Sequence, residues 1–220
     1  MNPGPRTLFE LFDNPFFPIT DTLIVSWVVV LVLIILAKLA TRNMEIVPGR
    51  VQNIVELIVS TIEDQIEPML PGLGRKLLPF IGTIFIFVGV SNILGIVPGV
   101  ANPTGDINTT LGLALVVFLF SHYYGVKNNG LWGYLKSQAE PIFIMLPINI
   151  VGELAKPVSH SFRLFGNIVG GGLIVTLVYQ TAPWLVPLPF HAWFDLFIGA
   201  VQALIFGMVA IAYISVAKSE

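Results

Sequence analysis

Long apolar runs alternate with short polar segments along most of the chain. The first run, from Thr22 to about Ala40, is long enough to cross about 30 Å of hydrocarbon as a helix that rises about 1.5 Å per residue. Two further runs of this kind precede residue 128. We therefore predict transmembrane helices at residues 22–41, 76–98 and 108–127.

The segment after the first run has a different pattern. Apolar residues recur at helical spacing, and polar residues occupy most of the opposite face. The apolar set is Val51, Ile54, Val55, Ile58, Ile62 and Ile66, and the polar set is Gln52, Asn53, Glu56, Glu63, Asp64 and Glu67. A helix of this kind lies in the membrane surface instead of crossing the bilayer. We therefore predict an interfacial helix at residues 48–70.

Two longer apolar segments end the chain, at residues 141–182 and 190–218. The first is about twice as long as a perpendicular crossing requires, so it must tilt strongly or break. A polar connector over residues 127–140 precedes it, and Asn128, Asn129 and Gly130 form a turn signal there. We therefore predict a hairpin of two long, tilted membrane helices.

Composition supports this membrane assignment. Of the 220 residues, 55% are hydrophobic and only 11% are charged, which exceeds what a soluble core requires. The net charge of -2 gives no indication of a nucleic-acid partner, and the absence of cysteine excludes disulfides and thiolate metal sites. No repeat or soluble segment divides the chain. The prediction is one all-α polytopic membrane domain, residues 1–220.

Basic residues predict the topology. Eight of the eleven lie on one side if the N-terminus is outside, as the positive-inside rule requires of the cytoplasmic side. They are Lys38, Arg42, Arg50, Arg75, Lys76, Lys127, Lys136 and Lys218. Residues 1–21 contain Arg6 and do not resemble a signal peptide, so we expect an external N-terminal segment and a cytoplasmic C-terminus. Lys156 and Arg163 remain, inside an apolar segment.

These two residues belong to a polar stripe. It consists of Asn149, Glu153, Lys156, His160, Arg163 and Asn167. Successive members are 4, 3, 4, 3 and 4 residues apart, which places all six on one helical face. Along a continuous helix the stripe would extend for about 27 Å. It could therefore line half or more of a membrane crossing.

Arg163 is the most informative member of the stripe. A basic side chain at mid-bilayer costs at least about 2.5–3.5 kcal/mol, and arginine cannot avoid the cost by losing its proton. A structural alternative is that Arg163 pairs with Glu153 to lock two helices together. A stripe that also holds a titratable histidine favours a hydrated ion path or proton relay. Lys156 alone could equally extend its ammonium to the interface.

A second set of polar residues lies in the last segment. Asp195 and Gln202 are seven residues apart and share a helical face. In a packed hairpin Gln202 would lie beside Arg163, where its amide oxygen could accept from the guanidinium, or it could only join the helices by a hydrogen bond of about 1 kcal/mol. Asp195 follows Pro187 and Pro189, which suggests a channel mouth at the external end, where a carboxylate gathers cations.

Several other residues are weaker candidates. The glycines Gly166, Gly170, Gly171 and Gly172 serve either close helix packing or a water path. Asn92 and His122 could line a channel or simply join helices. No nucleotide-binding, zinc or serine-hydrolase motif is present, so the sequence predicts no catalytic site, no cofactor and no metal.

The run Lys156-Pro-Val-Ser-His-Ser-Phe-Arg163-Leu-Phe-Gly-Asn167 resembles the signature of the F-type ATP synthase a subunit. Three other segments are similar to family segments and come in the same order. They are Asn92-Ile-Leu-Gly-Ile-Val-Pro98, Tyr123-Tyr-Gly-Val-Lys127 and Gln202-Ala-Leu-Ile-Phe206. The resemblance covers the chain from about residue 20 to its end.

The resemblance implies a stator subunit in a bacterial plasma membrane, with two aqueous half-channels facing a rotating c ring and with b-type peripheral stalk subunits as partners. Arg163 matches the essential arginine of the family, and Gln202 matches its partner. Asp195 occupies a position where many members have histidine or an acid. Many members also have glutamate nine residues after the arginine, where this chain has Gly172. We hypothesise that Asp195 or Glu153 supplies the missing acid.

The resulting functional prediction is ion translocation coupled to ATP synthesis, with protons as the default ion on family prevalence and sodium as the alternative. The chain itself would bind no nucleotide. A secondary transporter, the competing class, would have two repeated halves, whereas the charged stripe occurs only in the second half. A purely structural scaffold leaves the cost of Arg163 without an explanation.

Overall fold

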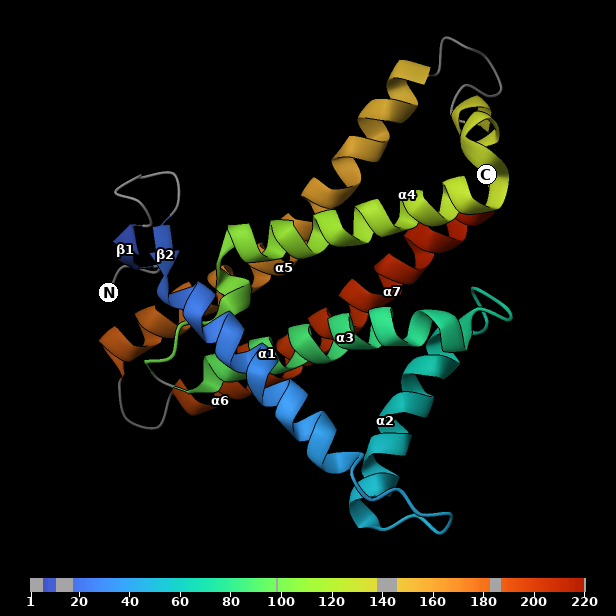
Figure 1. Ribbon diagram of the computed structural model, residues 1–220. Coiled ribbons are helices and arrows are strands. Elements are labelled where there is room, and N and C mark those ends of the chain that lie inside the picture. Colours follow the sequence, from blue (N-terminus) through green and yellow to red (C-terminus); the bar gives the residue numbers. More distant parts are fainter. Residues whose placement is uncertain (1–5, 11–17, 98, 138–145, 183–186, 220) are drawn as a thin grey trace.

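The computed structural model describes residues 6–10, 18–97, 99–137, 146–182 and 187–219, and it is almost entirely helical (Figure 1). The elements are β1 (Thr7–Glu10), β2 (Pro18–Thr20), α1 (Asp21–Ala40), α2 (Arg50–Ile66), α3 (Gly74–Ile93), the 3₁₀ turns η2 (Leu94–Ile96) and η3 (Pro103–Gly105), α4 (Ile107–Ser137), α5 (Leu146–Thr181), α6 (Pro187–His191), the π-helical segment η5 (Ala192–Ile198) and α7 (Gly199–Ser219). Five stretches in the described part are long and apolar enough to cross a membrane: Asp21–Ala40, Gly74–Ile96, Ile107–Tyr134, Leu146–Thr181 and Pro187–Lys218. The predicted all-α polytopic membrane fold is confirmed.

α1 begins close to the predicted residue 22. The hydroxyl of Thr20 caps it by accepting from the backbone N–H of Leu23, and Asp21 lies in its first turn, where a negative charge favours the helix dipole. Most apolar side chains of α1 are exposed, such as Trp27 at 63% and Leu31 at 58%. In a bilayer this surface is in contact with lipid or with another membrane helix.

α2 is shorter than the predicted interfacial helix at residues 48–70. It ends at Ile66 because the chain then turns, with the carboxylate of Glu67 accepting from the N–H groups of Gly72 (2.8 Å) and Gly74 (3.2 Å). Only the last part of its apolar face is buried, through Ile62 and Ile66 against α3. Figure 1 shows α2 set steeply against both α1 and α3.

α7 forms the centre of the bundle, because it packs against α3 on one side and α4 on the other (Figure 1). Fully buried apolar side chains line this contact, and they include Leu77, Ile81 and Val88 of α3, Val117 of α4, and Ala210, Ile211 and Ile214 of α7. Gly207 permits the close approach, since a Cβ atom there would lie 2.0 Å from the Phe85 ring.

α4 continues ten residues beyond the predicted span of residues 108–127, so the expected polar connector is partly helical. The predicted turn signal is present, because Gly130 adopts φ 71° and ψ 163° and interrupts the helix. The chain then forms further helical turns, since Tyr134 is buried against Gly125 and packs edge-on to His122. Residues 138–140 of the connector lie outside the described part.

The long hairpin predicted at residues 141–182 and 190–218 is present, although residues 141–145 are not among those described. α5 is one helix of 36 residues that contains Pro157. Its length of about 54 Å exceeds the bilayer core and requires tilt. The second arm is interrupted instead, because the π-helical η5 separates α6 from α7.

The short antiparallel pair β1–β2 was not predicted. The strands pair from Thr7 with Thr20 to Glu10 with Pro18. The backbone N–H of Arg6 also donates to the Asp21 carboxylate at 3.0 Å. This contact joins the N-terminal segment to the start of α1. Alternating polar and apolar residues are too few here to distinguish strands from a proline-rich loop.

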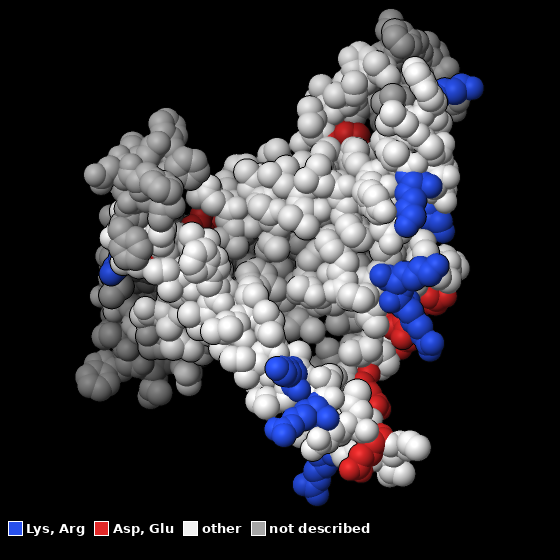
Figure 2. Space-filling view, viewed as in Figure 1, with Lys and Arg blue, Asp and Glu red and all other residues white. Residues whose placement is uncertain are grey.

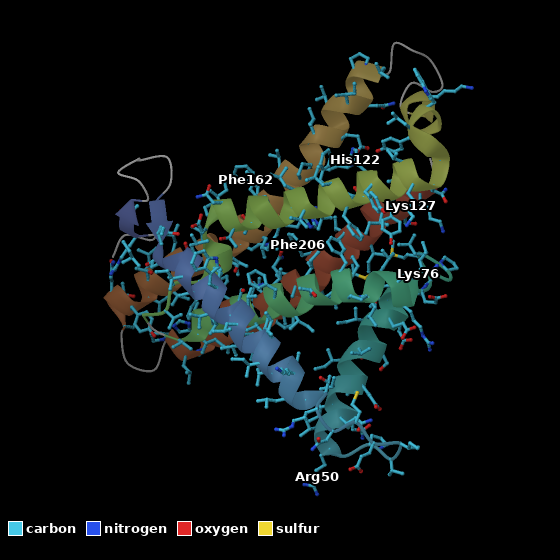
Figure 3. All side chains as sticks on the ribbon, viewed as in Figure 1. Arg50, Lys76, His122, Lys127, Phe162 and Phe206 are labelled. Atoms are coloured by element: carbon cyan, nitrogen blue, oxygen red, sulfur yellow. The ribbon has the colours of Figure 1, made fainter. Side chains whose placement is uncertain are left out.

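Basic side chains gather along one side of the face shown in Figure 2, and acidic side chains lie among them. Figure 3 places Arg50, Lys76 and Lys127 on that side. The C-terminus of α7 lies there too, because the Asn128 amide donates to the carbonyl oxygen of Lys218 at 3.0 Å. The N-terminal strands lie at the opposite side of the bundle (Figure 1).

Candidate functional site

The polar stripe lies on α5, and its surroundings change along the helix. Asn149, Glu153 and Lys156 are half-buried, His160 is buried, and Arg163 and Asn167 are exposed. A spacing of 3.5 residues drifts by about 20° per heptad around a straight helix of 3.6 residues per turn. The stripe therefore turns gradually from the protein interior to the outer surface of the chain.

The first part of the stripe forms an ion-paired cluster. The ammonium of Lys156 pairs with the carboxylate of Glu153, and Nε2 of His122 on α4 lies 3.8 Å from the other carboxylate oxygen. Lys156 also lies over the ring of Tyr213 on α7, 5.5 Å from its centroid. Glu153 thus pairs with Lys156, and no ion pair to Arg163 occurs in the described residues. His122, ranked below the stripe from sequence, belongs to this cluster.

His160 lies where α5 crosses α7. His160 is 2% exposed, and its ring centroid lies 3.8 Å from that of Phe206 with the two rings tilted by 40°, while the Tyr213 ring lies at 5.7 Å. Within the described residues, neither ring nitrogen has a hydrogen-bond partner. The next residue, Ser161, shares a hydrogen bond of 2.9 Å with Thr110 on α4. These contacts fix the orientation of α5 one turn before Arg163.

Arg163 is exposed, as is its neighbour Phe162, which Figure 3 shows at the outer edge of the bundle while Phe206 lies inside. His160 on α5 contacts Phe206 on α7, and the two helices run in opposite directions (Figure 1). The residue one turn after His160 therefore lies level with the residue one turn before Phe206. Gln202 thus lies at the level of Arg163. It is 7% exposed, and the described residues include no hydrogen bond between the two.

A second cluster surrounds Asp195 in η5. Its Oδ2 lies 2.5 Å from Nδ1 of His191, and the hydroxyl of Tyr179 on α5 lies 3.1 Å from Nε2 of the same imidazole. The other carboxylate oxygen faces Gly95, where a Cβ atom would lie 2.9 Å from Oδ1 of Asp195 and 3.1 Å from Nδ2 of Asn102. The Asp195 and His191 side chains are only 13% and 16% exposed.

Asn92 connects this cluster to the bundle. It is fully buried, donates to the carbonyl oxygen of Gly199 at 2.8 Å and accepts from the hydroxyl of Thr104 at 2.6 Å. The same Thr104 hydroxyl hydrogen is shared with the side-chain oxygen of Asn102, also at 2.6 Å. The sequence had indicated Asn92 but neither Thr104 nor Asn102. The sequence feature that could have indicated these two residues is the Asn102-Pro-Thr-Gly105 turn, which follows shortly after a predicted span.

The glycines of α5 have two different environments. Gly171 is buried, and a Cβ atom there would lie 3.0 Å from the side chain of Phe194, so it permits η5 to approach α5. Gly166, Gly170 and Gly172 have open space at the Cβ position. Gly172 in particular is exposed and touches no other element there. Close packing is thus a role of one glycine in this group.

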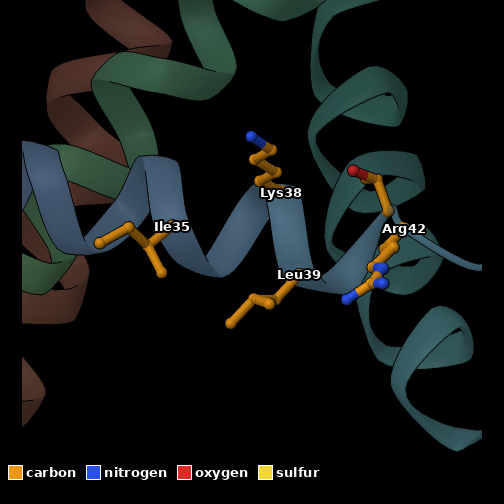
Figure 4. A pocket seen from close by; sticks show the side chains of 5 residues that line it. Ile35, Lys38, Leu39 and Arg42 are labelled. Carbon is orange, nitrogen blue, oxygen red and sulfur yellow. The ribbon is translucent and has the colours of Figure 1, made fainter.

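Other surface features lie apart from these clusters. A hollow of about 490 Å³ at the end of α1 is lined by Ile35, Lys38, Leu39, Thr41 and Arg42. Figure 4 shows Lys38 and Arg42 pointing to different sides of the helix, so they do not converge on one ligand. Among the described residues, no three histidine or acidic side chains come together in a way that could hold a metal ion.

Comparisons with known proteins agree with the resemblance in the sequence. Residues 23–215 match the family model of the ATP synthase A chain. The chain is 41% identical over 217 residues to ATP synthase subunit a 2 of Bradyrhizobium sp., covering 99% of this chain and 97% of the relative. It is 38% identical over 242 residues to the sodium ion specific ATP synthase subunit a of Propionigenium modestum, covering 96% of this chain and 84% of the relative. It is also 39% identical over 220 residues to ATP synthase subunit a 1 of Hahella chejuensis, covering 100% of this chain and 93% of the relative. With its five candidate spans, the chain therefore belongs to the a subunits of F-type ATP synthases, multi-pass membrane proteins of bacteria that translocate ions as part of that complex.

Proposed function

We propose that this chain conducts protons through two half-pathways that meet a ring of c subunits at Arg163. The observation that supports this proposal most directly is the position of Arg163 between two polar clusters along one continuous helix. Glu153 lies ten residues before Arg163, and Tyr179, which contacts His191, lies sixteen residues after it. These separations correspond to about 15 Å and 24 Å along the helix axis. Each cluster would serve one side of the membrane.

Arg163 would act on the ring. It lies on the outer surface of the chain, without an ion-pair partner in the residues described, and a permanent charge there costs at least about 2.5–3.5 kcal/mol in a bilayer. A carboxylate on a neighbouring c subunit would offset this cost. The fixed positive charge would favour the ionised carboxylate, promote release of its proton, and block leakage between the half-pathways. Gln202, at the same level, would restrain the guanidinium.

The usual glutamate of the family is replaced by Gly172, so another acid is needed. We assign Asp195 to the external half-pathway, with Asn92 holding α7 in place and Asn167 on the exposed surface of α5. We assign Glu153 to the cytoplasmic half-pathway, together with Asn149, Lys156 and His160. This assignment is supported by the half-buried carboxylates in both clusters, because a conducting acid must be reached by water and also face the interior.

The expected topology follows from the basic side of the bundle. The side with Arg50, Lys76 and Lys127 would face the cytoplasm, and residues 1–21 would lie outside a bacterial plasma membrane. The C-terminus would then be cytoplasmic. The b-type subunits of the peripheral stalk would complete the stator around this chain.

Sodium is the second candidate ion, because one relative of 38% identity is described as sodium ion specific. The test is ATP-driven acidification of inverted vesicles that contain the assembled complex, with wild type compared with Arg163→Ala. Acidification without sodium would support protons, and loss in the variant with intact assembly would support the arginine gate. Sodium uptake accelerated by a protonophore would identify sodium instead. Normal pumping by Arg163→Ala would contradict the mechanism.

A further inference from the structure

His191 is an unexpected feature of the second cluster, because it joins α5 to the last segment through both of its ring nitrogens. An ionised carboxylate only accepts hydrogen bonds, so Nδ1 of His191 donates to Asp195 at 2.5 Å. In that tautomer Nε2 accepts from the hydroxyl of Tyr179 at 3.1 Å. A hydrogen-bonded chain thus runs from Tyr179 through the imidazole to the carboxylate.

Along these three hydrogen-bonded residues, solvent exposure falls from Tyr179 to Asp195. Tyr179 is 43% exposed, whereas the side chains of His191 and Asp195 are 16% and 13% exposed. A group at the outer end can exchange protons with water, and the carboxylate at the inner end is largely withdrawn from it. The three side chains therefore connect the surface of the protein to an acid inside it.

The inner end of the chain faces a polar interior. Oδ1 of Asp195 points to the side of Gly95 at which Nδ2 of Asn102 lies, and this amide nitrogen is buried without a hydrogen-bond partner among the described residues. The absence of a side chain at Gly95 leaves that side of the carboxylate open. The two oxygens of Asp195 thus have different surroundings, with His191 on one side and the buried amide on the other.

We infer that His191 relays protons between the exposed Tyr179 end and Asp195, and that this relay makes the external half-pathway selective for protons over sodium. An imidazole can take a proton on Nε2 and release another from Nδ1, so its charge is unchanged after each transfer. The ring is then protonated on Nε2, and it returns to the starting tautomer by rotation or by proton exchange with water before the next transfer. A sodium ion cannot pass in this way, and a protonated imidazole next to the carboxylate repels it. The inference rests on the proposed function of Asp195.

The test measures ATP hydrolysis by the assembled complex with a protonophore present, so that no gradient opposes turnover. We expect His191→Ala to lower the rate at least about tenfold, because a positioned proton-transfer group contributes roughly 10²–10⁴-fold where it limits the rate. Added imidazole should restore the rate. Pyrazole has the same ring shape but is a very weak base, and it should not. Wild type with each azole is the control for buffer effects.

Two further variants separate relay from packing. His191→Gln keeps a hydrogen-bond donor of similar reach but cannot relay a proton, so it should remain slow. Asp195→Asn should be slow and should not respond to imidazole, because the acid itself is lost. Full activity in His191→Ala, equal rescue by pyrazole, or full activity in His191→Gln would overturn the relay. Failure of the proposed function would be seen differently, as a wild-type rate that depends on sodium.

Discussion

Asn92 holds the start of α7 against α3, and its replacement by leucine should weaken this contact measurably. The change keeps the approximate size of the side chain but removes two buried hydrogen bonds, to the carbonyl oxygen of Gly199 and from the hydroxyl of Thr104. Thr104 retains its bond to Asn102, and the Gly199 oxygen can still accept within its helix, so neither group is left fully unpaired. The loss is therefore that of the two bonds.

Hydrogen bonds between membrane helices contribute about 0.6 kcal/mol on average and up to about 1.7 kcal/mol. We therefore expect Asn92→Leu to cost about 1–3 kcal/mol in total. For a chain of this size, that corresponds to a decrease of about 2–12 °C in the unfolding temperature. Thermal unfolding of the purified subunit in detergent, followed by intrinsic tryptophan fluorescence, would measure it.

The matched control is Asn108→Leu, because Asn108 is also an asparagine near a helix end but is exposed. Surface substitutions usually change stability by less than about 0.5 kcal/mol. The unfolding temperature of this control should therefore stay within about 1–2 °C of wild type. Equal stability of Asn92→Leu and the control would refute the reasoning. It would mean that apolar packing alone joins α3 to α7.

Three other outcomes are expected. Gly125→Ala should lower stability by about 1–3 kcal/mol in the same assay, because its Cβ would lie 2.8 Å from the backbone oxygen of Ala217. The control Gly172→Ala has open space at the Cβ position and should be neutral. Equal effects of the two variants would contradict this packing argument. His160→Leu should raise or preserve the unfolding temperature, because two ring nitrogens that lack a hydrogen-bond partner among the described residues leave the core; a clear decrease would show that the imidazole contributes polar contacts. Asp195→Asn should reduce ATP-driven acidification, and adding Gly172→Glu should restore part of it by returning an acid to the usual position; full pumping in the single variant would remove Asp195 from the pathway.

Most of the helical architecture was predictable, because a run of twenty apolar residues has few alternatives to a membrane helix. α1 and α3 begin within two residues of their predicted positions. The helical turns after Gly130 were not predictable from the polar connector, since Tyr134 folds back against Gly125 on the other side of the break in α4.

The site was predictable in composition but not in arrangement. Helical spacing placed the six residues of the stripe on one face, but it did not indicate that Arg163 would be exposed while His160 would be buried three residues earlier. That difference arises from the position at which α7 crosses α5. Glu153 lies beside His122 of another helix, and His191, the partner of Asp195, contacts Tyr179 of α5, so only the packing of the helices could show the two clusters.

In the second arm of the hairpin, the π-helical segment η5 determines how far the side chains of α6 are rotated about the helix axis relative to those of α7. A π-helix contains one more residue per hydrogen-bonded turn than an α-helix, so it acts as a single-residue insertion. Each residue of an α-helix rotates the chain by about 100°. If the same residues of η5 were wound as an ordinary α-helix, the side chains before it would turn by about that angle relative to Gln202 and the rest of α7. The direction in which His191 points therefore depends on the local winding of η5, without any change to the surface that faces Arg163.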